Sequence, residues 1–246
     1  RDAQESRGLG DVYKRQILIN VIILTLVMFI QPGKFFKEAP WRPHLDVRFT
    51  LSYGHPQSQY FYDMLGIVPI LAGLTDSPAA NGPMLNFGGL IGWTFNKKML
   101  PWDDDLDMTV SMDMLDEMWK KFGTHTEVEL PNGTTVWVEV NPHYRETDNK
   151  LNTIDARVIH KDLGIFIDIA GVEDNKGKGK RDRFSSTSLW PSQQVTFGPD
   201  NDIIYVPNDP VQALKDRYGT VHVLKTAGTP IKPELWELGD DRYWLI

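Results

Sequence analysis

The segment from Asp103 to Asp107 (DDDLD) places four aspartates within five consecutive positions. The residues from Leu106 to Val110 alternate in a way that predicts a strand, so Asp105 and Asp107 point to one face while the residues between them point into the core. Carboxylates this close repel one another unless a cation lies between them, and open oxygen ligands suit Mg²⁺ or Mn²⁺ bound together with substrate phosphates. The spacing therefore predicts a divalent-metal site with Asp105 and Asp107 as ligands.

A third carboxylate, Asp168, lies in the otherwise apolar run from Ile165 to Ala170 (IFIDIA). A charge is expensive to bury in such a strand without a metal ion or another partner. A lone buried aspartate also fits a hydrogen-bonded core residue. In combination with the aspartate run, we predict that Asp168 is a third metal ligand.

Two glycines, Gly88 and Gly89, stand at the start of a predicted helix. Glycines at a helix N-terminus let backbone N–H groups approach a phosphate. Lys97, Lys98 and Arg157 are further candidate phosphate contacts, although each also fits a surface or ion-pair residue. Phosphate donors beside metal-binding carboxylates indicate a two-metal phosphoryl-transfer site.

The elements that position these residues follow from apolar spacing. A helix is expected over 59–74, interrupted at Gly66 and Pro69, and a second helix is expected between the N-cap Ser111 and the stop Gly123. Further elements are expected at 84–87, 90–95, 106–110, 127–140, 154–159 and 165–172. The pattern predicts an α+β domain with a mixed sheet flanked by helices.

The segment 127–140 alternates on both sides of Asn132-Gly133, which predicts a hairpin with a type I′ turn. Asn132-Gly133-Thr134 is also an N-glycosylation sequon. The positive φ that a type I′ turn requires explains Asn132 without a glycan.

Composition excludes several classes of protein. The chain has 246 residues, of which 26 are Lys or Arg and 33 are Asp or Glu, and its net charge of -7 argues against nucleic-acid binding. It contains no cysteine, so disulfides, thiolate zinc sites and cysteine nucleophiles are excluded.

The first 57 residues differ from the rest. Residues 1–16 have no apolar period, and we interpret them as non-native, adaptor-derived sequence. Residues 17–31 are almost entirely apolar, and we expect them to be a signal-anchor transmembrane segment. A cleaved signal peptide and a buried core helix are the less favoured alternatives. Residues 32–57 are expected to be a stem, and residues 58–246 the folded domain. An anchor of this kind predicts a single-pass type II protein of the early secretory or Golgi membrane with a lumenal domain.

The stretch GGLIGWTFNKKMLPWDDDLD resembles the signature of the LicD family. This family includes bacterial phosphocholine transferases, fukutin-related proteins and fungal proteins of mannosylphosphate transfer, and the resemblance is closest to the fungal branch. NTIDARVIHKDLGIFIDIAGV around Asp168 and LWPSQQVTFGPDNDIIYVPNDPVQALKDRYG from Leu189 to Gly219 are also similar to that family. The resemblance covers roughly residues 58–219.

The resemblance implies a nucleotidyltransferase-type fold in which Asp105, Asp107 and Asp168 bind Mg²⁺ or Mn²⁺. It implies that Gly88 and Gly89 border the phosphates of a nucleotide-diphospho donor, either GDP-mannose or a CDP-linked compound. The acceptor would be a glycan hydroxyl, and the product a phosphodiester-linked group.

Two other functions stay open at this point. A glycosyltransferase with a DxD motif also binds a metal ion and a nucleotide sugar, but its product lacks the phosphate. Some fungal members of the family are described as positive regulators, so the chain also fits a non-catalytic regulator of a mannosylphosphate transferase.

Overall fold

The computed structural model describes residues 18, 21–22, 25, 34–36, 38–39, 42–46, 48, 58–78, 82–100, 103–146, 152, 154–172 and 186–218. The helices are α2 (Ser58–Met64), α3 (Ile67–Ala72), α5 (Phe87–Asn96), α6 (Met112–Phe122), α7 (Ser186–Leu189) and α8 (Pro210–Tyr218). The strands are β1 (Glu38–Ala39), β2 (Arg42–Asp46), β3 (Met84–Leu85), β4 (Leu106–Ser111), β5 (Thr126–Glu129), β6 (Thr135–Val140), β7 (Ala156–His160), β8 (Phe166–Val172), β9 (Gln193–Phe197) and β10 (Asp202–Val206).

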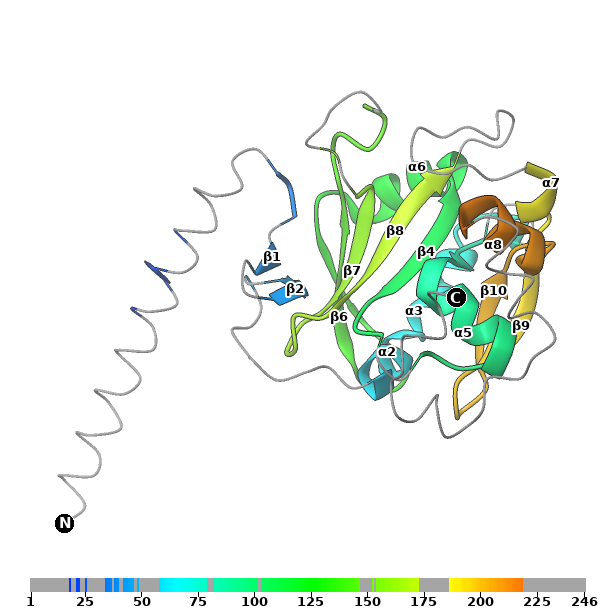
Figure 1. Cartoon of the computed structure of the whole chain (residues 1–246). Helices are drawn as coiled ribbons and strands as arrows, with labels where there is room; N and C mark the ends of the chain where they lie inside the picture. The colour runs from blue at the N-terminus through cyan, green and yellow to red at the C-terminus, as the bar shows by residue number, and fades with distance from the viewer. Residues whose placement is uncertain are drawn as a thin grey trace, which may run out of the picture.

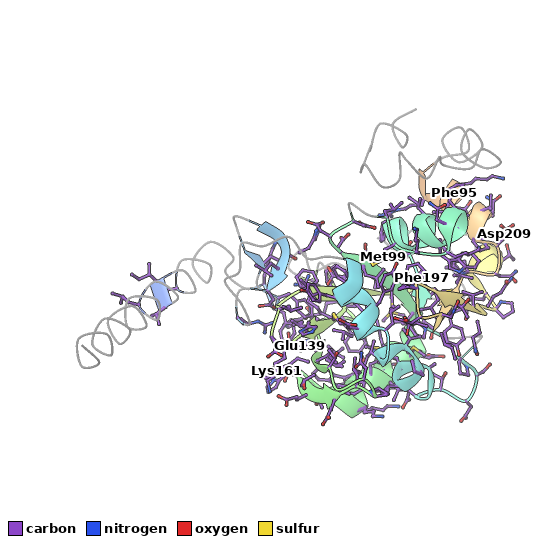
Figure 2. The ribbon with its side chains drawn as sticks, turned by 90° about the horizontal axis from the view of Figure 1, so that it is seen from below. Phe95, Met99, Glu139, Lys161, Phe197 and Asp209 are labelled. Atoms are coloured by element: carbon purple, nitrogen blue, oxygen red, sulfur yellow. The ribbon has the colours of Figure 1, made fainter. Side chains whose placement is uncertain are left out.

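One mixed sheet organises the domain, with the strand order β5-β6-β7-β8-β4-β3-β10-β9 (Figure 1). The pairs β4–β8 and β3–β10 are parallel, and the other neighbours are antiparallel. Helices flank the sheet, so the predicted α+β class with a mixed sheet is confirmed. Side chains fill the space between the layers (Figure 2), where Met99 and Phe197 are only 2% and 1% exposed.

Helix α6 covers one face of the central strands. On β4 this face carries Leu106, Met108 and Val110, all of them buried. On β8 it carries Gly171, where a Cβ atom would collide with the end of the Leu115 side chain on α6. Side chains alternate along a strand, so the residues of β4 and β8 that lie between those facing α6 point to the opposite face of the sheet.

The structure confirms the predicted interruption of the helix at 59–74 and the predicted ends of the helix between Ser111 and Gly123. The expected interruption in 59–74 separates α2 from α3 at Gly66, and Pro69 lies in the first turn of α3, where a proline is tolerated. Ser111 caps α6 by accepting a hydrogen bond from the N–H of the third helical residue at 3.1 Å. Gly123 ends this helix with a positive φ of 58°.

The hairpin of β5 and β6 is confirmed, but the type I′ turn is wrong. Gly133 has a φ of 84°, whereas φ at Asn132 is not positive. The Asn132 side chain instead accepts a hydrogen bond from the Thr134 N–H at 3.0 Å and donates one to the Asp63 carbonyl at 2.8 Å. Asn132 thus closes the turn and ties it to α2.

The predicted N-terminal segments fall largely outside the described residues. All of 1–16 and of 220–246 lies there, and so do all positions of the predicted anchor except Leu18, Val21, Ile22 and Thr25. Within the described portion of the chain, no helix combines the length and the apolar character needed to cross a membrane.

The interpretation of 32–57 as a stem needs correction. Its described part contains β1 and β2, which pair as an antiparallel hairpin. Leu45 forms an isolated bridge with Ile165, and the Asp46 N–H donates to the Gly164 carbonyl at 2.8 Å. Leu45 and Asp46 are 2% and 0% exposed, so this segment packs on the sheet. The pattern of apolar residues does not predict this hairpin, because charge pairs and a short β-bridge hold it on the sheet.

The left-handed backbone at Gly123 makes a test of the α6 boundary. Gly123→Ala should lower the free energy of unfolding by about 1–3 kcal/mol, because φ is 58° and ψ is -145° there, a conformation that side chains disfavour. The control Gly73→Ala, at the C-cap of α3 with φ -69°, should be neutral or stabilising by less than about 1 kcal/mol. Urea denaturation measures the free energy of unfolding of both variants. Equal changes would contradict the assignment of a strained backbone to Gly123 at the end of α6.

Candidate active site

Four charged residues line up across four neighbouring strands, on the face opposite α6. Glu139 on β6 pairs with Arg157 on β7, Arg157 pairs with Asp168 on β8, and Asp168 pairs with Asp107 on β4. Residues in direct register point to the same face of a sheet. This charged row therefore brings the predicted ligands Asp107 and Asp168 side by side.

Arg157 is the centre of the charged row and is fully buried. Its Nε donates to one oxygen of Asp168 at 2.6 Å, and its Nη2 donates to the other at 3.0 Å and to Glu38 at 3.0 Å. Its guanidinium lies 3.4 Å from the ring centroid of Phe166 and 4.6 Å from that of Phe36. Burial opposes the charge, but Asp168 and Glu38 outweigh burial and raise the pKa of Arg157. Arg157 is thus an ion-pair residue, and its contact with a donor phosphate stays a prediction.

The environment of Asp168 differs from the one predicted. Burial raises the pKa of Asp168, and the Arg157 guanidinium counteracts that shift. Both oxygens of the carboxylate already accept hydrogen bonds from Arg157 on β7, while Asp107 lies in register with Asp168 on the other neighbouring strand, β4. Asp168 lies in direct register with Asp107, and its role as a metal ligand stays a prediction.

A second arginine, Arg48, clamps the N-terminal segment to the same face. Its side chain lies between Asp46, which is fully buried, and Glu139, with Nη2 at 2.6 Å from both carboxylates. Although burial works against it, the pKa of Arg48 is raised by Asp46 and Glu139. Burial raises the pKa of Glu139, and Arg48 limits that rise. Two buried carboxylates are thereby paired with one partly exposed guanidinium.

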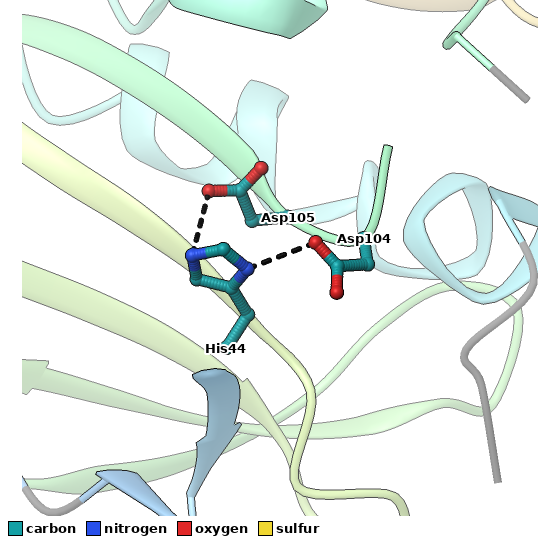
Figure 3. Close-up of side chains that lie close together, drawn as sticks. All are labelled: His44, Asp104 and Asp105. Carbon is teal, nitrogen blue, oxygen red and sulfur yellow. Dashed lines mark hydrogen bonds and ion pairs between the residues drawn. The ribbon is translucent and has the colours of Figure 1, made fainter. Parts of the chain in front are cut away.

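His44 on β2 brings an imidazole to the aspartate run (Figure 3). Its Nδ1 lies 2.9 Å from Asp104 Oδ1, and its Nε2 lies 3.3 Å from Asp105 Oδ2. One ligand atom from each of these three residues lies within 4.8 Å of the others, and all three side chains are partly exposed. This group, the His44 cluster, has the donors and the access that a divalent cation requires.

Asp103 supplies an independent indication of missing positive charge. Its Oδ2 is buried without a hydrogen-bond partner. Burial and repulsion from Asp105, Asp107 and Asp104 raise the pKa of Asp103 to about 8. Four carboxylates are thus crowded together at this end of β4. The donor set fits Mg²⁺ or Mn²⁺.

The glycine pair lies against the aspartate run. Asp103 occupies the space that a Cβ atom at Gly88 would need, and at Gly89 a Cβ atom would lie 2.7 Å from Leu106 Cδ1. Both glycines therefore have a packing role at the N-terminus of α5. Their contact with a donor phosphate stays a prediction.

The two lysines lie at the other end of α5. Lys97 is the C-cap of this helix, about 13 Å along the axis from Gly88 at 1.5 Å per residue. Its ammonium lies 3.4 Å from the ring centroid of Trp93, and burial lowers its pKa. Lys98 follows and is exposed. The structure does not bring either lysine to the glycine pair.

Sequence reasoning missed Glu139 on β6 and four residues from the segment interpreted as a stem, where apolar periodicity is absent. These four are Glu38, His44, Asp46 and Arg48. The one available signal was the spacing of charged and histidine residues in Arg42-Pro43-His44-Leu45-Asp46.

The buried charge pair makes a stability test. Arg157→Leu should lower the free energy of unfolding by about 3–5 kcal/mol, because Asp168 is left buried without its partner. Arg157→Leu combined with Asp168→Leu should recover most of that loss. Urea denaturation gives both values.

The matched control is Lys161→Leu, which breaks the exposed pair of Lys161 and Glu127. It should leave the unfolding midpoint nearly unchanged. If Arg157→Leu behaved like this control, the charged row would not be the structural centre of the site.

Two comparisons with known proteins agree with this geometry. Residues 83–209 match the family described as LicD/FKTN/FKRP, nucleotidyltransferase domain. Mannosyltransferase regulator 4 of Saccharomyces cerevisiae is 34% identical over 100 residues, which are 38% of this chain. The chain spans only 8% of the length of that relative. The yeast relative supports the predicted resemblance to the fungal branch, and because the family match covers just over half of the 246 residues, the chain belongs to the LicD family.

Proposed function

We propose that this protein is a metal-dependent phosphotransferase. It moves a phospho-sugar, phospho-alditol or phosphocholine group from a nucleotide-diphospho donor to a hydroxyl of a glycan, and mannosylphosphate is the group we favour. The observation that carries the proposal is the His44 cluster placed beside Asp107 and Asp168. Membership in the LicD family supports a transferase with a nucleotidyltransferase-type fold.

The His44 cluster would hold a divalent cation, with Asp107 and Asp168 next to it on the sheet. When bound there, the cation would offset the negative charge of a diphosphate and of the leaving phosphate. These residues combine an imidazole with several carboxylates, and the partnerless oxygen of Asp103 supports a cation in their midst.

The remaining chemistry falls to the carboxylates of the charged row. An acceptor oxygen attacks the distal phosphorus, a new P–O bond forms, and the bond to the nucleoside monophosphate breaks. The hydroxyl proton passes to a carboxylate. We assign this role to Asp107 or Asp168 because both lie on the face that carries the His44 cluster, and the two hydrogen bonds from Arg157 fix the direction of Asp168.

The N-terminus of α5 is the proposed contact for the donor's phosphates. Gly88 and Gly89 belong to the first turn of a ten-residue helix, where backbone N–H groups lack partners within the helix and the helix dipole favours an anion. The neighbouring Asp103 has a pKa raised to about 8, so at neutral pH it does not add a full negative charge there.

The donor and the location of the protein are further parts of the proposal. The name of the yeast relative supports a mannose-containing donor such as GDP-mannose, and a CDP-linked donor is the alternative that the family offers. The apolar run at 17–31 motivates a membrane anchor in the early secretory pathway or the Golgi, with the catalytic domain in the lumen.

A regulatory role is the second candidate, and one observation favours it. The yeast relative is named a regulator of a mannosyltransferase. In that case the site would bind a nucleotide sugar or a partner transferase without turnover. A glycosyltransferase with a DxD motif is the third candidate, and it differs in releasing nucleoside diphosphate.

The released nucleotide tests these alternatives. With GDP-mannose or a CDP-linked donor, a glycan acceptor and Mn²⁺, the protein should release nucleoside monophosphate, detected by chromatography. Nucleoside diphosphate would indicate glycosyl transfer. No release with any donor, metal or acceptor would favour the regulator.

Asp107→Asn tests the carboxylates within the same assay. It should reduce transfer at least about 100-fold while the unfolding midpoint stays near that of the wild type, because removing one of several crowded like charges relieves repulsion. Asp162→Ala, at an exposed position in the turn before β8, is the control and should keep full activity. Wild-type activity of Asp107→Asn would contradict the proposed chemistry.

A further inference from the structure

The hairpin that carries His44 is fastened to the sheet on both sides of that residue. Before it, Glu38 accepts a hydrogen bond from Arg157 at 3.0 Å. After it, Arg48 donates to Glu139 at 2.6 Å and 3.1 Å. Between them, Leu45 forms a bridge with Ile165. The position of His44 is therefore set by the same charged row that holds the predicted catalytic carboxylates.

The conformation of His44 favours a site over a chance contact. Its φ is 61°, in the left-handed region, where few non-glycine residues are found and where histidine is enriched. Its ring packs edge-on against Phe166 at 6.4 Å between centroids. Each ring nitrogen faces a different carboxylate, with Asp104 on one side and Asp105 on the other (Figure 3). The side chain is 35% exposed, so a cation in solution has access to it.

The separations of the donor atoms suit one shared ion. Two ligands of one Mg²⁺ lie at most about 4.2 Å apart, which is twice a bond length of roughly 2.1 Å. The ligand atoms of His44, Asp104 and Asp105 all lie within 4.8 Å of one another. A small adjustment of three partly exposed side chains then brings them to a common centre.

The chemistry of the imidazole adds a preference among metals. Mg²⁺ takes oxygen ligands almost exclusively and gives up its water reluctantly. An imidazole nitrogen is a better donor to transition metals, which accept mixed nitrogen and oxygen sets. We infer that His44 is a third protein ligand of the cation site and that it makes this site prefer Mn²⁺ to Mg²⁺. The inference rests on the proposed function and names the cofactor of that same site.

Titration of the protein with MnCl₂ and with MgCl₂ tests the inference without any donor or turnover. Calorimetry measures both metals, and the electron paramagnetic resonance of free Mn²⁺ provides a second reading. The wild type should bind Mn²⁺ at least about tenfold more tightly than Mg²⁺. His44→Ala should lose at least about tenfold in Mn²⁺ affinity and no more than about threefold in Mg²⁺ affinity.

His44→Asn is the second variant, because asparagine tolerates a positive φ and replaces the nitrogen donor with an oxygen donor. It should bind both metals with the preference for Mn²⁺ largely removed. The control is His143→Ala, since His143 is 51% exposed and pairs with Glu146 rather than with the aspartate run. Thermal unfolding of each variant verifies that the fold is kept.

The outcomes separate this inference from the proposed function. If His44→Ala binds Mn²⁺ as the wild type does while Asp105→Asn does not, the cation site stands and His44 is only an ion-pair partner of its carboxylates. If Asp105→Asn also binds Mn²⁺ normally, the cation site itself is wrong, and the metal-dependent function falls with it.

Discussion

The burial of Arg157 is the constraint on which the rest of the site depends. A guanidinium without solvent access requires carboxylates at fixed positions, and Asp168 and Glu38 meet that requirement. Asp168 is thereby fixed beside Asp107 in the sheet, and Glu38 ties the N-terminal hairpin to the same place. The buried guanidinium of Arg157 thus connects three parts of the chain that are distant in the sequence.

The hairpin gives the site its second half. The sheet offers aspartates, and the N-terminal segment adds His44 together with Asp46 and Arg48, which pairs with Glu139 on β6. Both arginines of this face already pair with carboxylates, and repulsion from the neighbouring aspartates contributes to the raised pKa of Asp103. Negative charge therefore dominates this face. The electrostatics therefore favour a divalent cation, and a cation in turn favours an anionic diphosphate donor.

Local patterns in the sequence predicted much of this arrangement. The alternation around Leu106 placed Asp107 on the face away from the core, the Ser111 cap and Gly123 bounded α6, and Asp168 stood out as a charge in an apolar strand. These signals act within a few residues. The hairpin could not be found in this way, because its anchors join residues 91 and 119 positions apart. The distance from the lysines to the glycines could not be read from the sequence either, because the length of α5 separates two segments that are close along the chain.

The central claim is that the hairpin and the sheet form one cation-dependent donor site. Anomalous X-ray diffraction near the manganese edge, from crystals grown with Mn²⁺ and a non-transferable GDP-mannose analogue, tests it most directly. The account predicts an anomalous peak within bonding distance of His44 and Asp105, with the diphosphate extending toward the N-terminus of α5. A manganese peak elsewhere, or a nucleotide bound away from the charged row, would contradict it.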